Sequence, residues 1–91
     1  MKKKQVRPTT LPEGVTDRDL TLLVRGLSDL FNCAHKEDIL KTAAHLVIGE
    51  EQVRRYLRGL VYSYETAKDI HDYLRDLTIK RSHKIQHTLA A

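Results

Sequence analysis

Residues 39–58, ILKTAAHLVIGEEQVRRYLR, contain two rows of apolar residues separated by a short break. Ala43 is small enough to lie where two helices touch, and Leu46 and Ile48 fall on either side of a turn. Gly49 interrupts the first row, because glycine is unfavourable inside a helix. The spacing therefore predicts two short helices joined by a tight turn near the centre of the chain.

The second of these helices combines inward apolar residues with outward polar ones. Val53 and Tyr56 are three positions apart, which places them on one inward face of a helix. Around that face lie four candidate nucleic-acid-binding residues: Gln52, Arg54, Arg55 and Arg58. Arginine binds phosphates or the edge of guanine, and glutamine pairs with the edge of adenine. This stretch resembles a helix-turn-helix, whose second helix enters a DNA major groove.

Two features depart from that pattern. The glycine usual in such a turn would fall at Val47, whereas the glycine of this chain is Gly49. Glu50 and Glu51 also put negative charge at the end of the helix that would approach DNA first, although acidic residues there favour the helix dipole. The alternative interpretation is that the arginines are an ordinary solvated helix face.

Helical periodicity continues on both sides of the central pair. Thr16 and Asp19 have the spacing of a capping box, which predicts a first helix over 17–31. Its inward residues are Leu20, Leu23, Val24, Leu27, Leu30 and Phe31. The central pair is predicted over 36–47 and 50–62, and a fourth helix over 65–82.

The boundary between the last two helices has an alternative. Because no Gly or Pro follows Gly59, one long helix could run from residue 50 past residue 80. A break near Ser63 is favoured, since a chain of 91 residues cannot easily cover so long a helix. The expected fold class is all-α, a small four-helix bundle with a helix-turn-helix-like central pair and a disordered basic N-terminal tail.

The chain divides into three segments by composition. Residues 1–14 are expected to form a flexible basic tail, 15–82 a helical domain, and 83–91 a frayed C-terminal end. The tail adds four candidate nucleic-acid-binding residues: Lys2, Lys3, Lys4 and Arg7. These four cations equal the whole formal charge of +4, so the rest of the chain is about neutral. Such a tail either grips phosphates without sequence preference or is simply a solvated terminus.

Several other functions are not expected. No glycine-rich phosphate loop or hydrolase motif is present, so the chain is not expected to be an enzyme or to need a cofactor. His83 and His87 would share a helix face, but no nearby Cys or carboxylate completes a metal site. The single cysteine, Cys33, fits a reducing compartment, and no apolar run approaches the length of a membrane span. The expected location is the cytoplasm, or the nucleus in a eukaryote.

The leading hypothesis is a small DNA-binding regulator that binds double-stranded DNA as a homodimer. Self-association is expected because apolar residues after residue 55 span more than one face of a helix. They are Tyr56, Leu57, Leu60, Val61, Tyr64, Ile70, Tyr73, Leu74 and Leu77. The alternative is a helical interaction module that binds a protein partner through an apolar groove and does not contact DNA.

Overall fold

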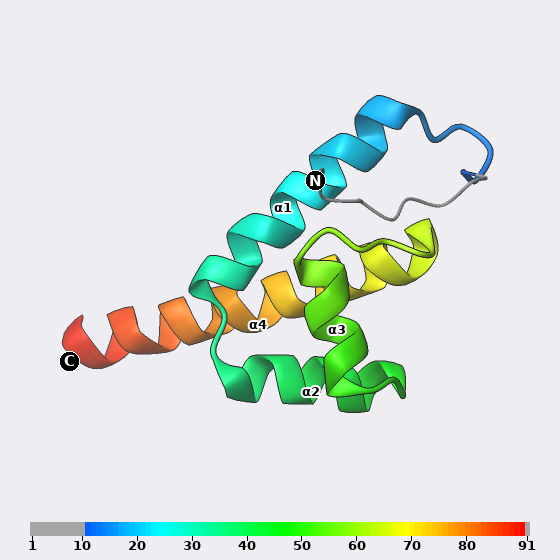
Figure 1. Ribbon diagram of the computed structural model, residues 1–91. Helices are drawn as coiled ribbons and strands as arrows, with labels where there is room; N and C mark the ends of the chain where they lie inside the picture. The colour runs from blue at the N-terminus through cyan, green and yellow to red at the C-terminus, as the bar shows by residue number, and fades with distance from the viewer. Residues whose placement is uncertain (1–10, 91) are drawn as a thin grey trace, which may run out of the picture.

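The protein is all-helical over the part of the chain that its structure describes. The computed structural model describes the backbone of residues 11–90 and the side chains of residues 11–81. Four helices form a compact body: α1 (Asp17–Cys33), α2 (Lys36–Leu46), α3 (Glu50–Leu57) and α4 (Tyr64–Ala90). Helices α1 and α4 cross, and the α2–α3 pair packs against both of them (Figure 1). None of these helices is both long and apolar enough to cross a lipid bilayer.

The predicted cap of α1 is confirmed. Asp19 N–H donates to Thr16 Oγ1 at 3.2 Å, and Thr16 N–H donates to Asp19 Oδ2 at 3.0 Å. These reciprocal bonds satisfy amides that have no partner within the helix. From this start the apolar spacing turns one face of α1 inward, and Leu20, Leu27 and Leu30 are buried. Phe31, which the spacing predicts to point inward, is partly exposed at the end of the helix.

The core lies where the four helices meet. Each helix contributes aliphatic side chains, and Tyr56 is the largest buried residue. The buried apolar residues are Leu20, Leu27, Leu30, Ile39, Ala43, Val53, Tyr56, Leu57, Val61, Ala67, Ile70 and Leu74. Burial of each large side chain contributes about 1.5–3 kcal/mol, so this cluster is the main source of stability.

Helix α3 is shorter than predicted: it ends at Leu57 and not at residue 62. Gly59 has a left-handed backbone with φ of 95°, and Leu60 N–H donates to Arg55 O at 3.0 Å. This closing bond is typical of a helix that stops on a glycine. Val61, which the apolar spacing predicts on the face of this helix, is instead buried in the connection to α4.

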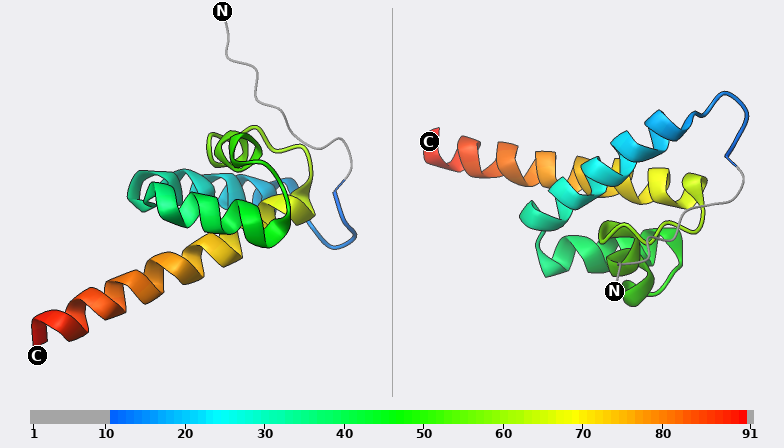
Figure 2. Two further views of the ribbon diagram at one scale, coloured as in Figure 1. Left: turned by 90° about the horizontal axis from the view of Figure 1, so that it is seen from below. Right: turned by 45° about the horizontal axis from the view of Figure 1, so that its top comes forward.

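The predicted break before the fourth helix is confirmed. Ser63 N–H donates to the hydroxyl of Tyr56 at 3.1 Å, which ties the connection to the end of α3. The backbone of α4 then stays helical from Tyr64 to Ala90, past the predicted end at residue 82 and through the segment expected to fray. The C-terminal part of α4 extends away from the other three helices (Figure 2).

Candidate nucleic-acid interface

The connection between α2 and α3 is a tight turn of three residues, Val47, Ile48 and Gly49. Val47 has a left-handed backbone, with φ of 56° and ψ of 48°. Ile48 N–H donates to Ala43 O at 3.0 Å, and Val47 N–H donates to Ala44 O at 3.3 Å. These are the two bonds of a Schellman motif, in which the left-handed residue is usually glycine. Val47 therefore adopts the backbone that the expected glycine would have adopted.

Valine is an unfavourable residue at this position. Its Cβ approaches the following carbonyl oxygen in the left-handed region, and β-branching restricts the side chain further. The side chain of Val47 is 88% exposed, so packing inside the chain does not compensate for the strain. Backbone strain of this kind is found more often at functional sites than elsewhere. The strained turn is therefore a candidate functional position on the surface.

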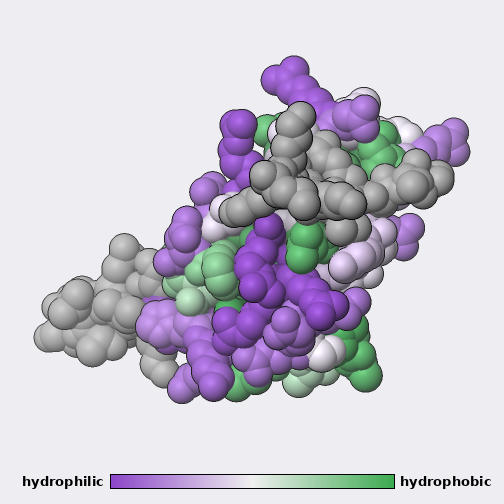
Figure 3. Space-filling model, in the orientation of Figure 1, coloured by the Kyte–Doolittle hydropathy of each residue, from purple (hydrophilic) through white to green (hydrophobic). Residues whose placement is uncertain are grey.

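Helix α3 has a buried face and an exposed face. Val53, Tyr56 and Leu57 point into the core and hold the helix in place. Its exposed residues are Glu51, Gln52 and Arg55, and Arg58 is exposed directly after its end, whereas Arg54 is partly buried at the edge. Hydrophilic surface covers the centre of the molecule over α3 in Figure 3. The structure thus places Gln52, Arg55 and Arg58 together on the solvent side.

The arginines of α3 are paired with the two glutamates of its first turn. Arg54 donates from Nε to Glu50 Oε2 at 2.9 Å. Glu51 Oε1 lies 3.8 Å from Arg55 Nε and 3.6 Å from Arg58 Nη2. Three cations therefore face two anions, which leaves the helix with a small positive excess. The pairs of Arg55 and Arg58 are exposed and long, so each contributes at most about 1 kcal/mol and an incoming phosphate can replace it.

Lys2, Lys3, Lys4 and Arg7 of the basic tail lie outside the described residues. Leu11 packs against the core cluster, and Val15 N–H donates to Pro12 O at 3.1 Å. The attachment point of the tail is therefore fixed to the body of the protein.

The ion pair of Asp38 and Arg81 was not predicted from the sequence. Asp38 is the third residue of α2 and is 2% exposed, while Arg81 lies on α4. Arg81 Nη2 donates to Asp38 Oδ1 at 2.6 Å, and His35 N–H donates to Asp38 Oδ2 at 3.1 Å. In the second bond Asp38 has the same role as Asp19 in α1. The sequence signal for this bond is an acidic residue in the first turn of the helix. The pairing with Arg81 carried no sequence signal, because it joins residues 43 positions apart.

The surroundings of Asp38 favour its ionised form. Burial by itself would raise the pKa of this carboxyl. The hydrogen bonds from Arg81 and from His35 N–H, with the charge of Arg81, outweigh burial and hold the pKa below its ordinary value. Asp38 is thus an anion that fixes the start of α2 against α4.

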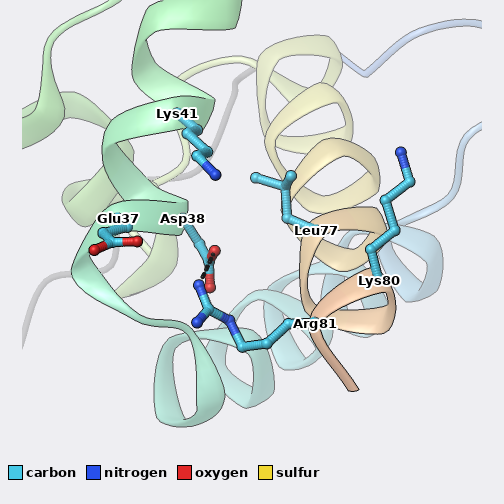
Figure 4. Close-up of a pocket in the computed structure, with 6 residues that line it drawn as sticks. All are labelled: Glu37, Asp38, Lys41, Leu77, Lys80 and Arg81. Carbon is cyan, nitrogen blue, oxygen red and sulfur yellow. Dashed lines mark hydrogen bonds and ion pairs between the residues drawn. The ribbon is translucent and has the colours of Figure 1, made fainter. Parts of the chain in front are cut away.

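A pocket of about 330 Å³ lies beside this ion pair, between α2 and α4. Its lining residues are Glu37, Asp38, Lys41, Leu77, Lys80 and Arg81. In Figure 4, Lys41 points across the space between the helices towards Leu77, and the Asp38–Arg81 pair closes one end. The carboxylate of Glu37 and the amine of Lys80 point away from this space (Figure 4).

The other end of α2 also contacts α4. The rings of His45 and Tyr73 are stacked, with centroids 4.1 Å apart and planes 7° from parallel. An open hollow beside them is bordered by Asp69, Asp72 and Asp76. Within the described part of the chain, no group of three or more His, Cys, Asp or Glu residues could hold a metal ion. The pair His83 and His87 lies beyond the described side chains.

Comparison with known proteins gives no relative: no protein-family model, curated protein or solved structure matches this chain significantly.

Proposed function

We propose that this protein is a small DNA-binding regulator in which α2 and α3 form a helix-turn-helix. The observation that carries the proposal is the turn. Its three-residue length fits the short turn of a helix-turn-helix, and the left-handed backbone of Val47 is one that the glycine common in such turns adopts readily. Helix α3 would then be the helix that enters the major groove.

The exposed side chains of α3 support this role. Gln52, Arg55 and Arg58 are free of the core and carry donors suited to base edges and phosphates. Arg54 is less available, because Glu50 engages its Nε at 2.9 Å and the residue is partly buried. We therefore assign base and phosphate contacts to Gln52, Arg55 and Arg58, and we assign to Arg54 the support of the helix.

The near-neutral charge of α3 implies that electrostatic attraction comes mainly from elsewhere. The tail residues Lys2, Lys3, Lys4 and Arg7 equal the entire formal charge of +4. We propose that they contact the phosphate backbone, which positions the protein but does not read sequence. Affinity would then depend steeply on salt, whereas sequence preference would depend on α3.

The decisive experiment compares two double variants in a duplex-shift titration at two salt concentrations. Arg55→Ala/Arg58→Ala removes two exposed arginines of α3, and Arg18→Ala/Arg25→Ala removes two exposed arginines of α1. Both variants should lose some affinity because both lose two positive charges. Only Arg55→Ala/Arg58→Ala should lose about a further 1–3 kcal/mol for each base contact removed. Equal losses would show that α3 is not the contact surface, and absence of any shift at low salt would end the DNA proposal.

A second candidate function is a protein-interaction module, and an apolar row on α2 favours it. Leu40 and Ala44 are exposed four positions apart on α2, on a different side of the helix from the buried Ile39 and Ala43, and the exposed Val47 follows in the turn. Apolar surface is visible in Figure 3 at the lower right, where α2 ends and the turn begins.

The same row is the candidate surface for self-association. Many of the apolar residues from which the sequence predicts a homodimer are buried within one chain and are not available to a second copy. Tyr56, Leu57, Val61, Ile70 and Leu74 are buried in the core. Sedimentation equilibrium of the wild type and of Leu40→Ser/Val47→Ser tests this surface. A monomer at high micromolar concentration in both proteins would remove the homodimer.

A further inference from the structure

The pocket between α2 and α4 contains a lysine that makes no ion pair with the described residues. Three cations line it, and two of them are paired: Arg81 with Asp38 at 2.6 Å, and Lys80 with Asp76 at 3.0 Å. Lys41 has no ion pair or side-chain hydrogen bond among the described residues, and its amine points into the space between the helices (Figure 4). Lys41 is therefore a cation without a direct ion-pair partner among the described residues, and it lies in a concave site.

Arg81 is only partly used as a donor. A guanidinium has five N–H groups in a planar fork, and Asp38 takes the hydrogen bond from Nη2. Arg81 Nε is buried and has no hydrogen-bond partner within residues 11–81, whose side chains are described, and the Arg81 side chain is 32% exposed. The exposed part of the guanidinium can therefore serve a second acceptor while Nη2 remains bound to Asp38.

We propose that this pocket binds a small oxyanion, a phosphate or carboxylate group, held between Lys41 of α2 and Arg81 of α4. Arginine and lysine beside each other suit this chemistry, because oxygen acceptors form their strongest hydrogen bonds with charged donors. The volume of about 330 Å³ accommodates such a group with a short organic substituent, and Leu77 supplies an apolar wall for that substituent. Glu37 also lines the pocket, but its carboxylate points away from the space between Lys41 and Leu77 (Figure 4).

Binding would join two helices that have different roles. Lys41 is on α2, which leads through the turn at Val47 into α3, whereas Arg81 is on α4. An oxyanion between them stabilises one position of α2 and, through the turn, one position of α3. This regulatory part rests on the proposed DNA-binding function, and it requires that DNA and oxyanion change each other's affinity by the same factor.

The test uses the full chain and inorganic phosphate as the probe, with ionic strength held constant by chloride. Amide NMR signals of Lys41, Leu77 and Arg81 should shift in a saturable way. Lys41→Gln should weaken phosphate binding about tenfold or more, as expected for the loss of one hydrogen bond between charged groups. The matched control is Lys36→Gln, which removes an exposed lysine of the same helix that does not line the pocket, and phosphate affinity should stay unchanged.

Two results would overturn the site: no saturable shift with phosphate, or equal weakening by Lys41→Gln and Lys36→Gln. A duplex titration without phosphate then identifies the source of the oxyanion. If the pocket takes a backbone phosphate of DNA, Lys41→Gln weakens duplex binding and free phosphate competes with the duplex. If it takes a free anion, Lys41→Gln leaves duplex binding unchanged. Because the first titration contains no DNA, failure of the pocket and failure of the DNA proposal give different results.

Discussion

Arg81, on α4, donates a hydrogen bond at 2.6 Å to Asp38, which lies 43 positions earlier at the start of α2. Asp38 also accepts the N–H of His35 and so closes the first turn of its own helix. One buried carboxylate therefore caps α2 and attaches it to α4. Both functions depend on the negative charge of Asp38.

Replacement of Asp38 by alanine should destabilise the fold. The change leaves the His35 amide and the Arg81 guanidinium without their acceptor, and loss of a hydrogen bond to a charged group costs about 1.5–3 kcal/mol. The loss of stability should be smaller than for a fully buried ion pair, because the Arg81 side chain is 32% exposed and can be hydrated when Asp38 is removed. Urea denaturation measures the difference, and the exposed neighbour variant Glu37→Ala serves as control. A midpoint equal to that of wild type would contradict the role of Asp38.

The stability of the protein should fall at acid pH through Asp38. Its pKa in the folded protein is below the ordinary value, so the folded state binds this proton less readily than the unfolded state. The resulting stability is present above the unfolded pKa of about 3.9 and is lost as pH falls through the folded pKa. Urea midpoints between pH 2 and 7 check this: wild type and Asp38→Asn should differ most near neutrality and converge in acid. A constant difference at all pH values would show that the carboxylate charge is not responsible.

Val47→Gly should make the protein more stable. Glycine removes left-handed strain of about 1–2 kcal/mol and adds about 0.4–1 kcal/mol of backbone entropy to the unfolded state, for a net gain of roughly 1 kcal/mol. Packing should be little affected, because the valine side chain is 88% exposed. Val47→Ala keeps a Cβ at the strained position and should gain less. A thermal melt that ranks the glycine variant below wild type would show that the valine side chain stabilises the turn.

Gly26 should resist substitution because of one neighbour on α4. A Cβ at Gly26 would lie 2.9 Å from His71 Nε2, closer than such atoms approach in proteins. Alanine is favoured over glycine in a helix by about 1 kcal/mol, but the imidazole must move to admit the methyl group. On its own, Gly26→Ala should therefore give little or no stabilisation. Made in the His71→Ala variant, the same change should stabilise the protein by about 1 kcal/mol. Additive effects in this double-mutant cycle would contradict the contact.

Deletion of residues 1–7 should weaken DNA binding equally for all sequences. The deletion removes Lys2, Lys3, Lys4 and Arg7, and the slope of log affinity against log salt should fall by about 0.9 for each phosphate that the tail neutralises in the wild type. The ratio of affinities for preferred and random duplexes should not change, since binding to phosphates carries no sequence information. A changed ratio would place the tail in a groove against base edges.

Local sequence signals predicted most of the helices. Thr16 and Asp19 fixed the start of α1, and apolar spacing identified its buried face. The end of α3 was predicted at residue 62, because the apolar row continues through Val61 in the sequence. Gly59 ends the helix earlier with φ of 95°, and a glycine after a run of helix formers was a stop signal that the sequence already contained.

The candidate sites were predictable to different degrees. The exposure of Gln52, Arg55 and Arg58 followed from their positions relative to Val53 and Tyr56, because helical spacing determines which residues share a face. The pocket of Lys41 and Arg81 could not be predicted in this way. It depends on how α4 crosses α2, and that crossing is set by side-chain packing between distant segments.

The stack of His45 on Tyr73 has a consequence for local unfolding. Together with the Asp38–Arg81 pair, it attaches α2 to α4 at both ends, so full detachment of α2 must break both contacts. Helix α3 is short and packs against α2. Amide hydrogen exchange should therefore show α2 and α3 opening as one cooperative unit, with protection greater than that of an isolated helix of either length.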